Sequence, residues 1–322
     1  MKAYVTGAGG MIGSHLIERL KDEGFLTFGS YFRPTVDLND IDTTDICFFK
    51  LDIRNQNKIL KFLRKEKPDV IFHLAAQSFP VESWKDPYYT MDVNVKGTIA
   101  LFESIIRVKK ETPNYDPKII VITSSAIYGE SLMKYNERNL PDETCEMIPL
   151  HPYGVSKAAE DLLCYQYFKN YGLKTVRVRL FNCTGPRKKG DISSDFAKRA
   201  AILKLKNDNK LIVGNLSAKR AILDVRDLCE ALLLLAEKGI PGESYNVSSS
   251  EIFKMDHVVD CLEKITGVKY NMVVDKKLLR PADEQLYAGN CEKIKSLGWE
   301  QKYNYLETLT SVFDYWSKKI TQ

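Results

Sequence analysis

Short apolar runs alternate with longer amphipathic stretches along the first half of the chain. Apolar runs of this length indicate buried strands, and apolar residues spaced three and four apart indicate helices that pack on them. Regular alternation of the two predicts a parallel sheet covered by helices on both faces, the doubly wound α/β class. The predicted strands are Lys2–Thr6, Leu26–Phe32, Ile46–Leu51, Val70–Leu74, Ile119–Thr123 and Thr175–Phe181, and the predicted helices include Gln56–Lys65, Val93–Val108 and Ser156–Asn170.

The alternation ends after about Asn182, where a stretch rich in Lys, Asp and Ser at residues 187–195 leads into a helical pattern. We expect residues 1–181 to form the main domain, to which elements of about 220–247 return. Residues 182–219 and 248–322 are expected to form a smaller mixed α/β lobe. The elements predicted beyond Asn182 are the strands Lys210–Val213, Arg220–Val225 and Ser244–Val247 and a helix near Asp227–Lys238.

Composition narrows the class of protein. A chain of 322 residues with 44% hydrophobic content can bury a full core, as one large domain or two coupled ones. The formal charge of +5 is modest, and Lys and Arg are mixed with Glu and Asp, which argues against nucleic-acid binding. The longest apolar patch, Ala231–Ala236, is too short to span a membrane. Because the first predicted strand begins at residue 2, we expect no signal peptide and a cytoplasmic location.

The seven cysteines lie far apart, between Cys47 and Cys291. No two of them form a C-x-x-C pair, and no cluster of histidines accompanies them. This pattern predicts buried thiols rather than a metal site or a disulfide framework.

The segment TGAGGMIG at residues 6–13 lies between the first predicted strand and a helical pattern. Its spacing, Gly7-x-x-Gly10-x-x-Gly13, differs by one residue from the G-x-G-x-x-G form. A glycine turn from strand to helix lets the backbone approach a pyrophosphate and directs helix N–H groups at it. Taken alone the segment could be only a tight turn, but its position opening a βαβ unit favours a dinucleotide site that includes Met11 and Ile12.

The ends of the next strands bear on the choice of cofactor. An acidic residue after the second strand would select NAD, but FGSYFRPT has no acid before Asp37 and carries Arg33 instead. A guanidinium suits the 2′-phosphate of NADP, so NADP is favoured, and NAD remains the alternative if Arg33 is only a surface residue. Asp52 and Ile53, after the third strand, are expected to meet the adenine ring of the cofactor. After the fourth strand come Leu74, Ala75 and Ala76, where small residues would let the backbone pass beneath the cofactor. His73 lies inside an apolar run and is predicted to be a hydrogen-bonded core histidine.

Three residues form the candidate catalytic constellation. Ser124 lies at the end of a predicted strand in ITSSAIYG, and Tyr153 and Lys157 lie four residues apart in HPYGVSKAAE, hence on one helix face. A phenol ordinarily titrates near pH ~10, so it needs a neighbouring ammonium to act as a base near neutrality. A serine hydroxyl can orient the reacting hydroxyl or carbonyl group. Y-x-x-x-K is common by chance, but its position behind the glycine turn and a strand-end serine favours catalysis.

The segments TGAGGMIG, HLAAQS, TSSAIYG and YGVSK resemble the extended short-chain dehydrogenase/reductase family, and the resemblance runs along essentially the whole chain. It implies a Rossmann domain that binds NADP, a substrate-binding lobe and a Ser–Tyr–Lys triad. It also implies a homodimer built on two helices per subunit, such as Val93–Val108 and Ser156–Asn170.

The later segments LFNCTGPRKKGD, VGNLSAKRAILDVRD, SYNVSS and LRPADEQ most resemble the branch that acts on GDP-sugars, the GDP-mannose 4,6-dehydratases and GDP-4-keto-6-deoxymannose reductases. This branch implies a GDP-sugar substrate and a role in cell-surface glycan biosynthesis. Two arginines, Arg220 and Arg280, could bind the diphosphate of the substrate through bidentate hydrogen bonds. The alternative is that these arginines form ion pairs at the protein surface. Arg187 lies in the same loop as Asn182. The substrate-binding residues implied are Gln77, Ser125, Asn182, Arg220 and Arg280.

The chain departs from the dehydratase pattern at one decisive position. Dehydratases carry a carboxylate after the catalytic Ser or Thr, in patterns such as TSE or TDE, whereas this chain has Ala126. A methyl group cannot abstract a proton, and a 4-keto reductase or an epimerase needs no such base. Glu82 resembles a glutamate of the reductases, the alternative being a relocated base. The segment RAI at residues 220–222 also differs from the usual RDF or RDW.

We therefore expect an NADP-dependent enzyme that transfers hydride at C4 of a GDP-hexose, as a GDP-4-keto-6-deoxy-sugar reductase. A 4,6-dehydratase acting on GDP-mannose or GDP-N-acetylglucosamine is the first alternative, and a nucleotide-sugar epimerase the second. A regulator that has lost catalysis is disfavoured, because both Tyr153 and Lys157 are present.

Overall fold

The main sheet consists of seven parallel strands in the order β3-β2-β1-β4-β5-β6-β10. The computed structural model describes residues 1–275 and 286–321, and the number of strands given for this sheet refers to these residues. The order reverses between β1 and β4, as in doubly wound dinucleotide-binding folds. The strands are β1 (Lys2–Thr6), β2 (Leu26–Tyr31), β3 (Cys47–Lys50), β4 (Val70–His73), β5 (Lys118–Ile122), β6 (Lys174–Leu180) and β10 (Ser244–Val247).

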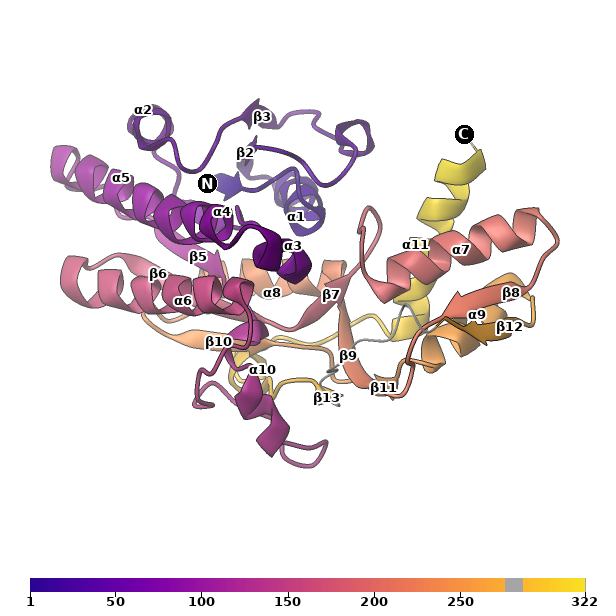
Figure 1. Cartoon of the computed structure of the whole chain (residues 1–322). Coiled ribbons are helices and arrows are strands. Elements are labelled where there is room, and N and C mark those ends of the chain that lie inside the picture. The colour runs from indigo at the N-terminus through magenta and orange to yellow at the C-terminus, as the bar shows by residue number, and fades with distance from the viewer. Residues whose placement is uncertain (276–285, 322) are drawn as a thin grey trace.

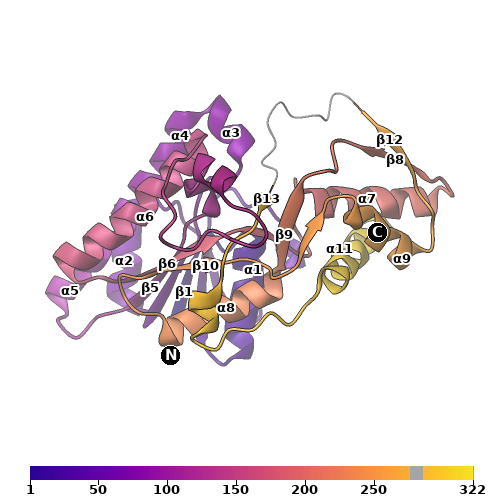
Figure 2. The same cartoon turned by 90° about the horizontal axis from the view of Figure 1, so that it is seen from below.

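Helices cover both faces of this sheet, as the sequence predicts (Figures 1 and 2). Along β1, Ala3 and Val5 pack into the core on one face and Tyr4 into the core on the other, which is the alternation that a two-sided strand requires. The helices are α1 (Met11–Asp22) and α8 (Val225–Lys238) on the face of Ala3, and α2 (Gln56–Glu66), α5 (Gly97–Glu111) and α6 (Pro152–Tyr171) on the face of Tyr4.

Two helix starts differ from the predicted ones. Helix α6 begins at Pro152, four residues early, because the ring Nδ1 of His151 accepts the Gly154 amide at 3.0 Å and caps the helix. Helix α5 follows a π-helical turn, η2 (Asp92–Lys96), which continues the short helix α4 (Pro87–Met91). The remaining short helices are η1 (Leu38–Asp40), α3 (Pro80–Lys85), η3 (Ser125–Ile127), η4 (Glu130–Lys134) and α10 (Glu292–Lys295).

A smaller lobe is built mainly from the second half of the chain, around its own apolar core. Of the segment 220–247, α8 and β10 lie on the main sheet, whereas β9 pairs with β7, β11 and β13. The elements of this lobe are the strands β7 (Asn182–Thr184), β8 (Lys210–Val213), β9 (Lys219–Asp224), β11 (Ile252–Lys254), β12 (Asn271–Val274) and β13 (Leu286–Tyr287), and the helices α7 (Ile192–Leu205), α9 (His257–Thr266) and α11 (Tyr305–Thr321).

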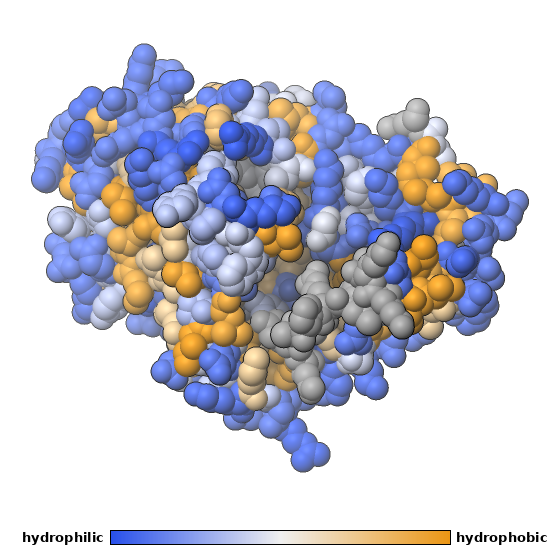
Figure 3. Space-filling view, viewed as in Figure 1, coloured by the Kyte–Doolittle hydropathy of each residue, from blue (hydrophilic) through white to orange (hydrophobic). Residues whose placement is uncertain are grey.

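The two lobes lie side by side, and the face shown in Figure 3 is hollowed near its centre, between them. The carboxyl ends of β1, β4 and β5 lie at one edge of the main sheet, because these neighbouring strands are parallel. In open α/β sheets ligands bind at this edge, where the strand order reverses. The fold therefore places the predicted residues that follow β1, β4 and β5 at this edge of the sheet.

The cysteines are free thiols, and six of the seven are buried, as predicted. Cys47 is the exception: it is exposed because β3 is the edge strand of the main sheet. No helix within residues 1–275 and 286–321 has the length and apolar character needed to cross a membrane.

Candidate active site

The turn between β1 and α1 is closed by backbone contacts that leave no space for side chains. A Cβ on Gly7 would lie 2.7 Å from the amide nitrogen of Ala75, and Gly7 has φ of +75°, a conformation that other residues rarely adopt. A Cβ on Gly13 would overlap the carbonyl oxygen of Gly7. The Gly10 amide closes the turn by donating to that carbonyl at 3.0 Å. These glycines bring the start of α1 directly against the end of β4.

The start of α1 has free hydrogen-bonding capacity. Gly10 is its N-cap and offers no side chain to the first amides, and no acidic residue lies in the first turn, which contains Met11 and Ile12. The first N–H groups of a helix lack partners within the helix and attract anions. An uncapped helix start behind a turn without side chains fits the pyrophosphate of a dinucleotide.

The loop after β4 lies against this turn. The Thr6 hydroxyl accepts the amides of Leu74 and Ala75, both at 3.1 Å, which fixes the backbone leading into Ala76. Gln77 is held by protein groups: its amide donates to the Asn94 side chain at 2.8 Å, and its Nε2 donates to the Thr90 hydroxyl at 3.1 Å. The structure thus uses the Gln77 side chain within its own loop.

Arg33 and Asp52 lie at the ends of β2 and β3. The Arg33 guanidinium is exposed and lies 5.2 Å from the ring centroid of Tyr89. Within residues 1–275 and 286–321 it forms no salt bridge, so its charge is available to an anion. Asp52, by contrast, is paired with Arg54 at 2.7 Å, which lowers the pKa of the carboxyl group. Ile53 is buried next to Asp52.

Ser124, Tyr153 and Lys157 come from two segments that pack together. Ser124 caps η3, with its Oγ accepting the Ala126 amide at 3.1 Å. Helix α6 packs on η3 so closely that a Cβ on Gly154 would lie 2.8 Å from the carbonyl oxygen of Ala126. Tyr153 precedes Gly154 in the first turn of α6, and Lys157 follows one turn later. The structure therefore brings all three predicted residues to one corner of the crevice.

Lys157 is a buried cation with a defined set of partners. Its ammonium donates to Glu160 Oε2 at 2.6 Å and to the Ile122 carbonyl oxygen at 2.9 Å. Burial by itself lowers the pKa of Lys157, but the carboxylate of Glu160 and the phenol of Tyr153 outweigh it, so the pKa is raised. Lys157 is therefore charged at neutral pH.

Ala126 is buried, and its neighbour Ser125 is engaged with other parts of the fold. The Ser125 hydroxyl lies 3.0 Å from the Leu180 carbonyl oxygen and 2.7 Å from the Tyr287 hydroxyl, with hydrogen bonds to both. Glu82 lies on α3, half-exposed and ion-paired with Lys85 at 2.7 Å. The position of the expected dehydratase carboxylate is thus occupied by a methyl group.

Asn182 and Arg220 lie on neighbouring strands of the second lobe. Asn182 is opposite Ile222 in the pairing of β7 and β9, so Arg220, two residues before Ile222, is on the same face as Asn182. The Asn182 side-chain nitrogen is buried without a hydrogen-bond partner among the described residues. Arg280 lies outside the residues that the structure describes.

The Arg187 side chain binds two side chains of α1. Its guanidinium binds both carboxylate oxygens of Glu18, at 3.1 and 2.5 Å, and lies 3.2 Å from His15 Nδ1. It is a buried link between the loop after β7 and the first helix.

Three residues at this site were missed by the sequence reasoning. His151 stacks on Tyr153 with ring centroids 5.9 Å apart, and burial lowers the pKa of its imidazole. Tyr287 reaches Ser125 across 162 positions of sequence, and no local pattern signals such a contact. Glu160 could have been found, because a helix that exposes Tyr153 and Lys157 to a site also turns position 160 inward.

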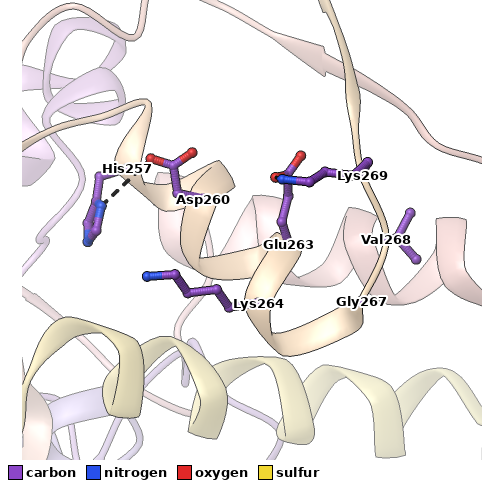
Figure 4. A pocket seen from close by; sticks show the side chains of 7 residues that line it. All are labelled: His257, Asp260, Glu263, Lys264, Gly267, Val268 and Lys269. Carbon is purple, nitrogen blue, oxygen red and sulfur yellow. Dashed lines mark hydrogen bonds and ion pairs between the residues drawn. The ribbon is translucent and has the colours of Figure 1, made fainter.

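A separate surface hollow lies on the second lobe, and none of the predicted site residues lines it (Figure 4). It is bordered by ion pairs of His257 with Asp260 at 3.9 Å and of Glu263 with Lys269 at 2.5 Å. The Asp260 carboxylate and the Lys269 ammonium are exposed to solvent, so these contacts contribute little to stability.

Comparison with known proteins agrees with this architecture. A family model described as GDP-mannose 4,6 dehydratase matches residues 4–312. GDP-6-deoxy-D-mannose reductase of Pseudomonas aeruginosa is 28% identical over 264 residues, covering 80% of this chain and 83% of that protein. The structure of UDP-glucose 4-epimerase from Thermotoga maritima with UDP-glucose has a TM-score of 0.88 at 25% identity, covering 99% of this chain and 100% of the other. RMD from Pseudomonas aeruginosa, solved with NADPH, has a TM-score of 0.81 at 26% identity, covering 99% and 100%.

The glycine turn leads to a prediction that uses an internal control. Gly7 and Gly24 both have positive φ, of +75° and +78°, but a Cβ on Gly24 would meet nothing within 4 Å. We expect Gly24→Ala to lower the free energy of unfolding by about 1 kcal/mol, the cost of the strained backbone alone. Gly7→Ala should cost at least about 2 kcal/mol more, because its Cβ also meets the Ala75 backbone. Urea unfolding measures both, and equal losses would contradict the close contact.

Proposed function

Because the chain belongs to the GDP-mannose 4,6 dehydratase family of extended short-chain dehydrogenases/reductases, we propose that it is an NADP-dependent reductase of a GDP-4-keto-6-deoxy sugar. The reaction is hydride transfer at C4 of a GDP-hexose. The geometry of Ser124, Tyr153 and Lys157 supports the chemistry at C4, and Ala126 supports reduction over dehydration.

The cofactor site is proposed for the turn between β1 and α1. The absence of side chains at Gly7, Gly10 and Gly13 and the uncapped start of α1 fit a pyrophosphate. Arg33, exposed and without a salt bridge in the described residues, fits the 2′-phosphate that distinguishes NADP from NAD. RMD, a relative of similar fold, was solved with NADPH. When bound, the nicotinamide supplies the hydride. The proposed contacts are Gly7, Gly10, Met11, Ile12, Gly13, Arg33, Asp52, Ile53, Leu74, Ala75, Ala76 and Lys157.

Proton transfer at the sugar C4 oxygen is assigned to Tyr153. In reduction its hydroxyl gives a proton to the developing alkoxide, and in the reverse direction its phenolate takes one from the C4 hydroxyl. Ser124 donates a hydrogen bond to the same oxygen and so orients it. Lys157, charged at neutral pH, stabilises the phenolate.

The single observation that carries the reductase proposal is the methyl group of Ala126. Dehydration of the sugar requires a base that removes the C5 proton, and dehydratases of this branch supply a carboxylate at that position. Ala126 is buried beneath the first turn of α6, and Ser125 beside it is committed to Leu180 and Tyr287. Reduction needs no base at C5, so the residues present suffice for it.

Dehydration is the second candidate, favoured by the family match over residues 4–312. Its base would have to come from another element. His151, stacked on Tyr153, is a titratable side chain on the same turn. Glu82 is ion-paired on α3 and would have to leave Lys85 first.

The nucleotide end of the substrate is proposed to lie over the second lobe. Asn182 and Arg220 share one face of neighbouring strands there, and Arg280, which the resemblance implies as the second arginine, lies outside the described residues. Two guanidinium groups bind a diphosphate in bidentate fashion. Gln77 and Ser125 are proposed to contact the sugar with their backbone groups. Their side chains form hydrogen bonds within the protein.

Mass spectrometry with defined GDP-sugars tests the reaction. We expect GDP-mannose and GDP-N-acetylglucosamine to keep their mass without added reductant, and a GDP-4-keto-6-deoxy sugar to gain two hydrogens while NADPH is consumed. Tyr153→Phe should lower turnover by at least about 100-fold while NADPH still binds. Loss of one water from either GDP-sugar would establish the dehydratase instead, and a new isomer of unchanged mass the epimerase.

Cofactor choice is tested at Arg33. Arg33→Ser should raise the Kd for NADPH by about 10- to 100-fold, because a charged hydrogen bond to phosphate is lost, and should leave the Kd for NADH unchanged. Arg107→Ser, on the outer surface of α5, is the matched control and should change neither. Fluorescence titration gives both constants. An equal change for the two cofactors would place the 2′-phosphate elsewhere.

We also propose a homodimer through α5 and α6. Helix α6 presents Val155, Leu162 and Tyr165 to solvent, and such exposed apolar side chains on one helix indicate a protein interface. Leu162→Glu should convert the dimer to a monomer in analytical ultracentrifugation. Leu205→Glu on α7 is the matched control, since Leu162 and Leu205 are exposed to 59% and 56%. A monomeric wild type would refute this assembly.

A further inference from the structure

Helix α6 carries a buried acid next to the buried lysine of the site. The side chains of Lys157 and Glu160 are 4% and 1% exposed, and Lys157 Nζ lies 2.6 Å from Glu160 Oε2. Two buried opposite charges at this distance stabilise each other, whereas either one alone would tend to lose its charge. Neither the composition of the chain nor the triad requires an acid at position 160. The buried carboxylate of Glu160 therefore needs a physical explanation.

The second carboxylate oxygen of Glu160 faces a hydrogen-bonded pair. Thr98 Oγ lies 3.3 Å from Glu160 Oε1, and His73 Nε2 lies 2.9 Å from Thr98 Oγ and 3.6 Å from Oε1. The Thr98 hydroxyl donates its proton to an oxygen that can only accept, the Asn94 carbonyl at 2.6 Å or the carboxylate itself. Nε2 of His73 must therefore be the donor to Thr98, with its N–H on the side of Glu160.

The other nitrogen of His73 completes the assignment. Nδ1 lies 2.8 Å from the Thr6 hydroxyl, which already accepts the amides of Leu74 and Ala75. Thr6 thus donates its proton to Nδ1, and His73 is neutral. Full burial, together with the charge of Lys157, lowers the pKa of His73 to about 3. A continuous series of polar contacts therefore runs from Lys157 through Glu160, Thr98 and His73 to Thr6 at the glycine turn.

The other charges near Lys157 are neutralised elsewhere. Asp161, the next residue of α6, binds Arg177 at 2.9 Å and Arg179 at 3.0 Å, both from β6. Burial raises the pKa of the Cys164 thiol on α6, so it stays uncharged, and His73 on β4 is neutral. Tyr153 lies on the same helix face. Glu160 is thus the carboxylate that compensates the charge of Lys157.

The ammonium of Lys157 has three N–H donors. Glu160 and the Ile122 carbonyl use two of them, and the third has no protein acceptor in the described part of the chain. Because two of the N–H groups are fixed by hydrogen bonds, the tetrahedral ammonium leaves one direction for the third N–H. Glu160 and the Ile122 carbonyl oxygen set that direction, and the flexible lysine side chain does not.

We propose that Glu160 is a positioning residue that keeps Lys157 protonated and directs its free N–H at the reacting groups, with His73 and Thr98 holding the carboxylate in place. The role rests on the proposed function, because it acts through the lysine of the triad. It requires no proton transfer through the chain, since His73 remains neutral throughout. It also explains a buried histidine that the sequence predicts to be structural.

The protonation of Lys157 can be followed without turnover. In protein labelled with ¹³C at lysine Cε, the Lys157 resonance is assigned by its absence in Lys157→Arg. In wild type it should stay protonated up to the highest pH at which the chain is folded. In Glu160→Gln, which keeps an acceptor but not the charge, a deprotonation midpoint should appear at least about one pH unit below that limit, and Glu160→Asp should move it back toward the limit.

Activity provides the second readout. The high-pH limb of kcat/KM should move to lower pH in Glu160→Gln by a similar amount, whereas a folding defect would lower the rate equally at every pH. Glu103→Gln is the matched control: Glu103 on α5 accepts the Tyr167 hydroxyl of α6 at 2.7 Å, away from Lys157. It should change neither readout.

The outcomes separate the two proposals. If Lys157 in folded Glu160→Gln stays protonated over the same pH range as in wild type, Glu160 is not the compensating charge. A shifted midpoint with an unshifted pH–rate limb overturns its positioning role in catalysis. If wild type turns over no GDP-sugar but the midpoint shifts as expected, the proposed function fails while the charge pairing stands.

Discussion

The close backbone contact at Gly7 and Gly13 is the constraint on which the site depends. With no Cβ at either position, β1, the start of α1 and the loop after β4 meet at backbone distance, where the strand order reverses. The Thr6 hydroxyl joins the same corner to β4 through two amides. The proposed triad residues and the cofactor contacts are positioned relative to this corner, because they follow strands of the same sheet or lie on a helix packed against it.

Buried charge is the second feature that organises the molecule, and α6 carries three of the buried charged side chains. Its inner face presents Lys157, Glu160 and Asp161, each with a partner. Arg179 binds Asp161 and also donates to the Glu143 carbonyl oxygen at 2.8 Å and to the Tyr128 hydroxyl at 3.1 Å. The same helix that carries Tyr153 is therefore tied to the sheet and to the segment before it. Breaking one partner of such a set leaves a buried charge uncompensated, which is far more costly than losing a surface pair.

Family membership and chemistry are separate questions for this chain. A match over residues 4–312 to a dehydratase family coexists with a reductase relative and an epimerase of closely similar fold. One fold supports several reactions because side chains at the strand ends, and not the sheet, meet the substrate. Ala126 is the residue at which this chain departs from the dehydratase pattern. His151, stacked on Tyr153, is a further titratable side chain at the same turn.

The sequence by itself determined the sheet, the covering helices, the glycine turn and the grouping of Ser124 with Tyr153 and Lys157. These follow from local periodicity and from residue types at strand ends, which act over a few residues along the chain. Tertiary structure alone decided the partners. It brings Arg187 into contact with Glu18, Tyr287 with Ser125, and Glu160 with His73, and the members of each pair are far apart in sequence. The physical reason is that a buried charge or hydroxyl takes whichever partner the packing of distant elements brings within hydrogen-bond distance, and no local pattern encodes that packing.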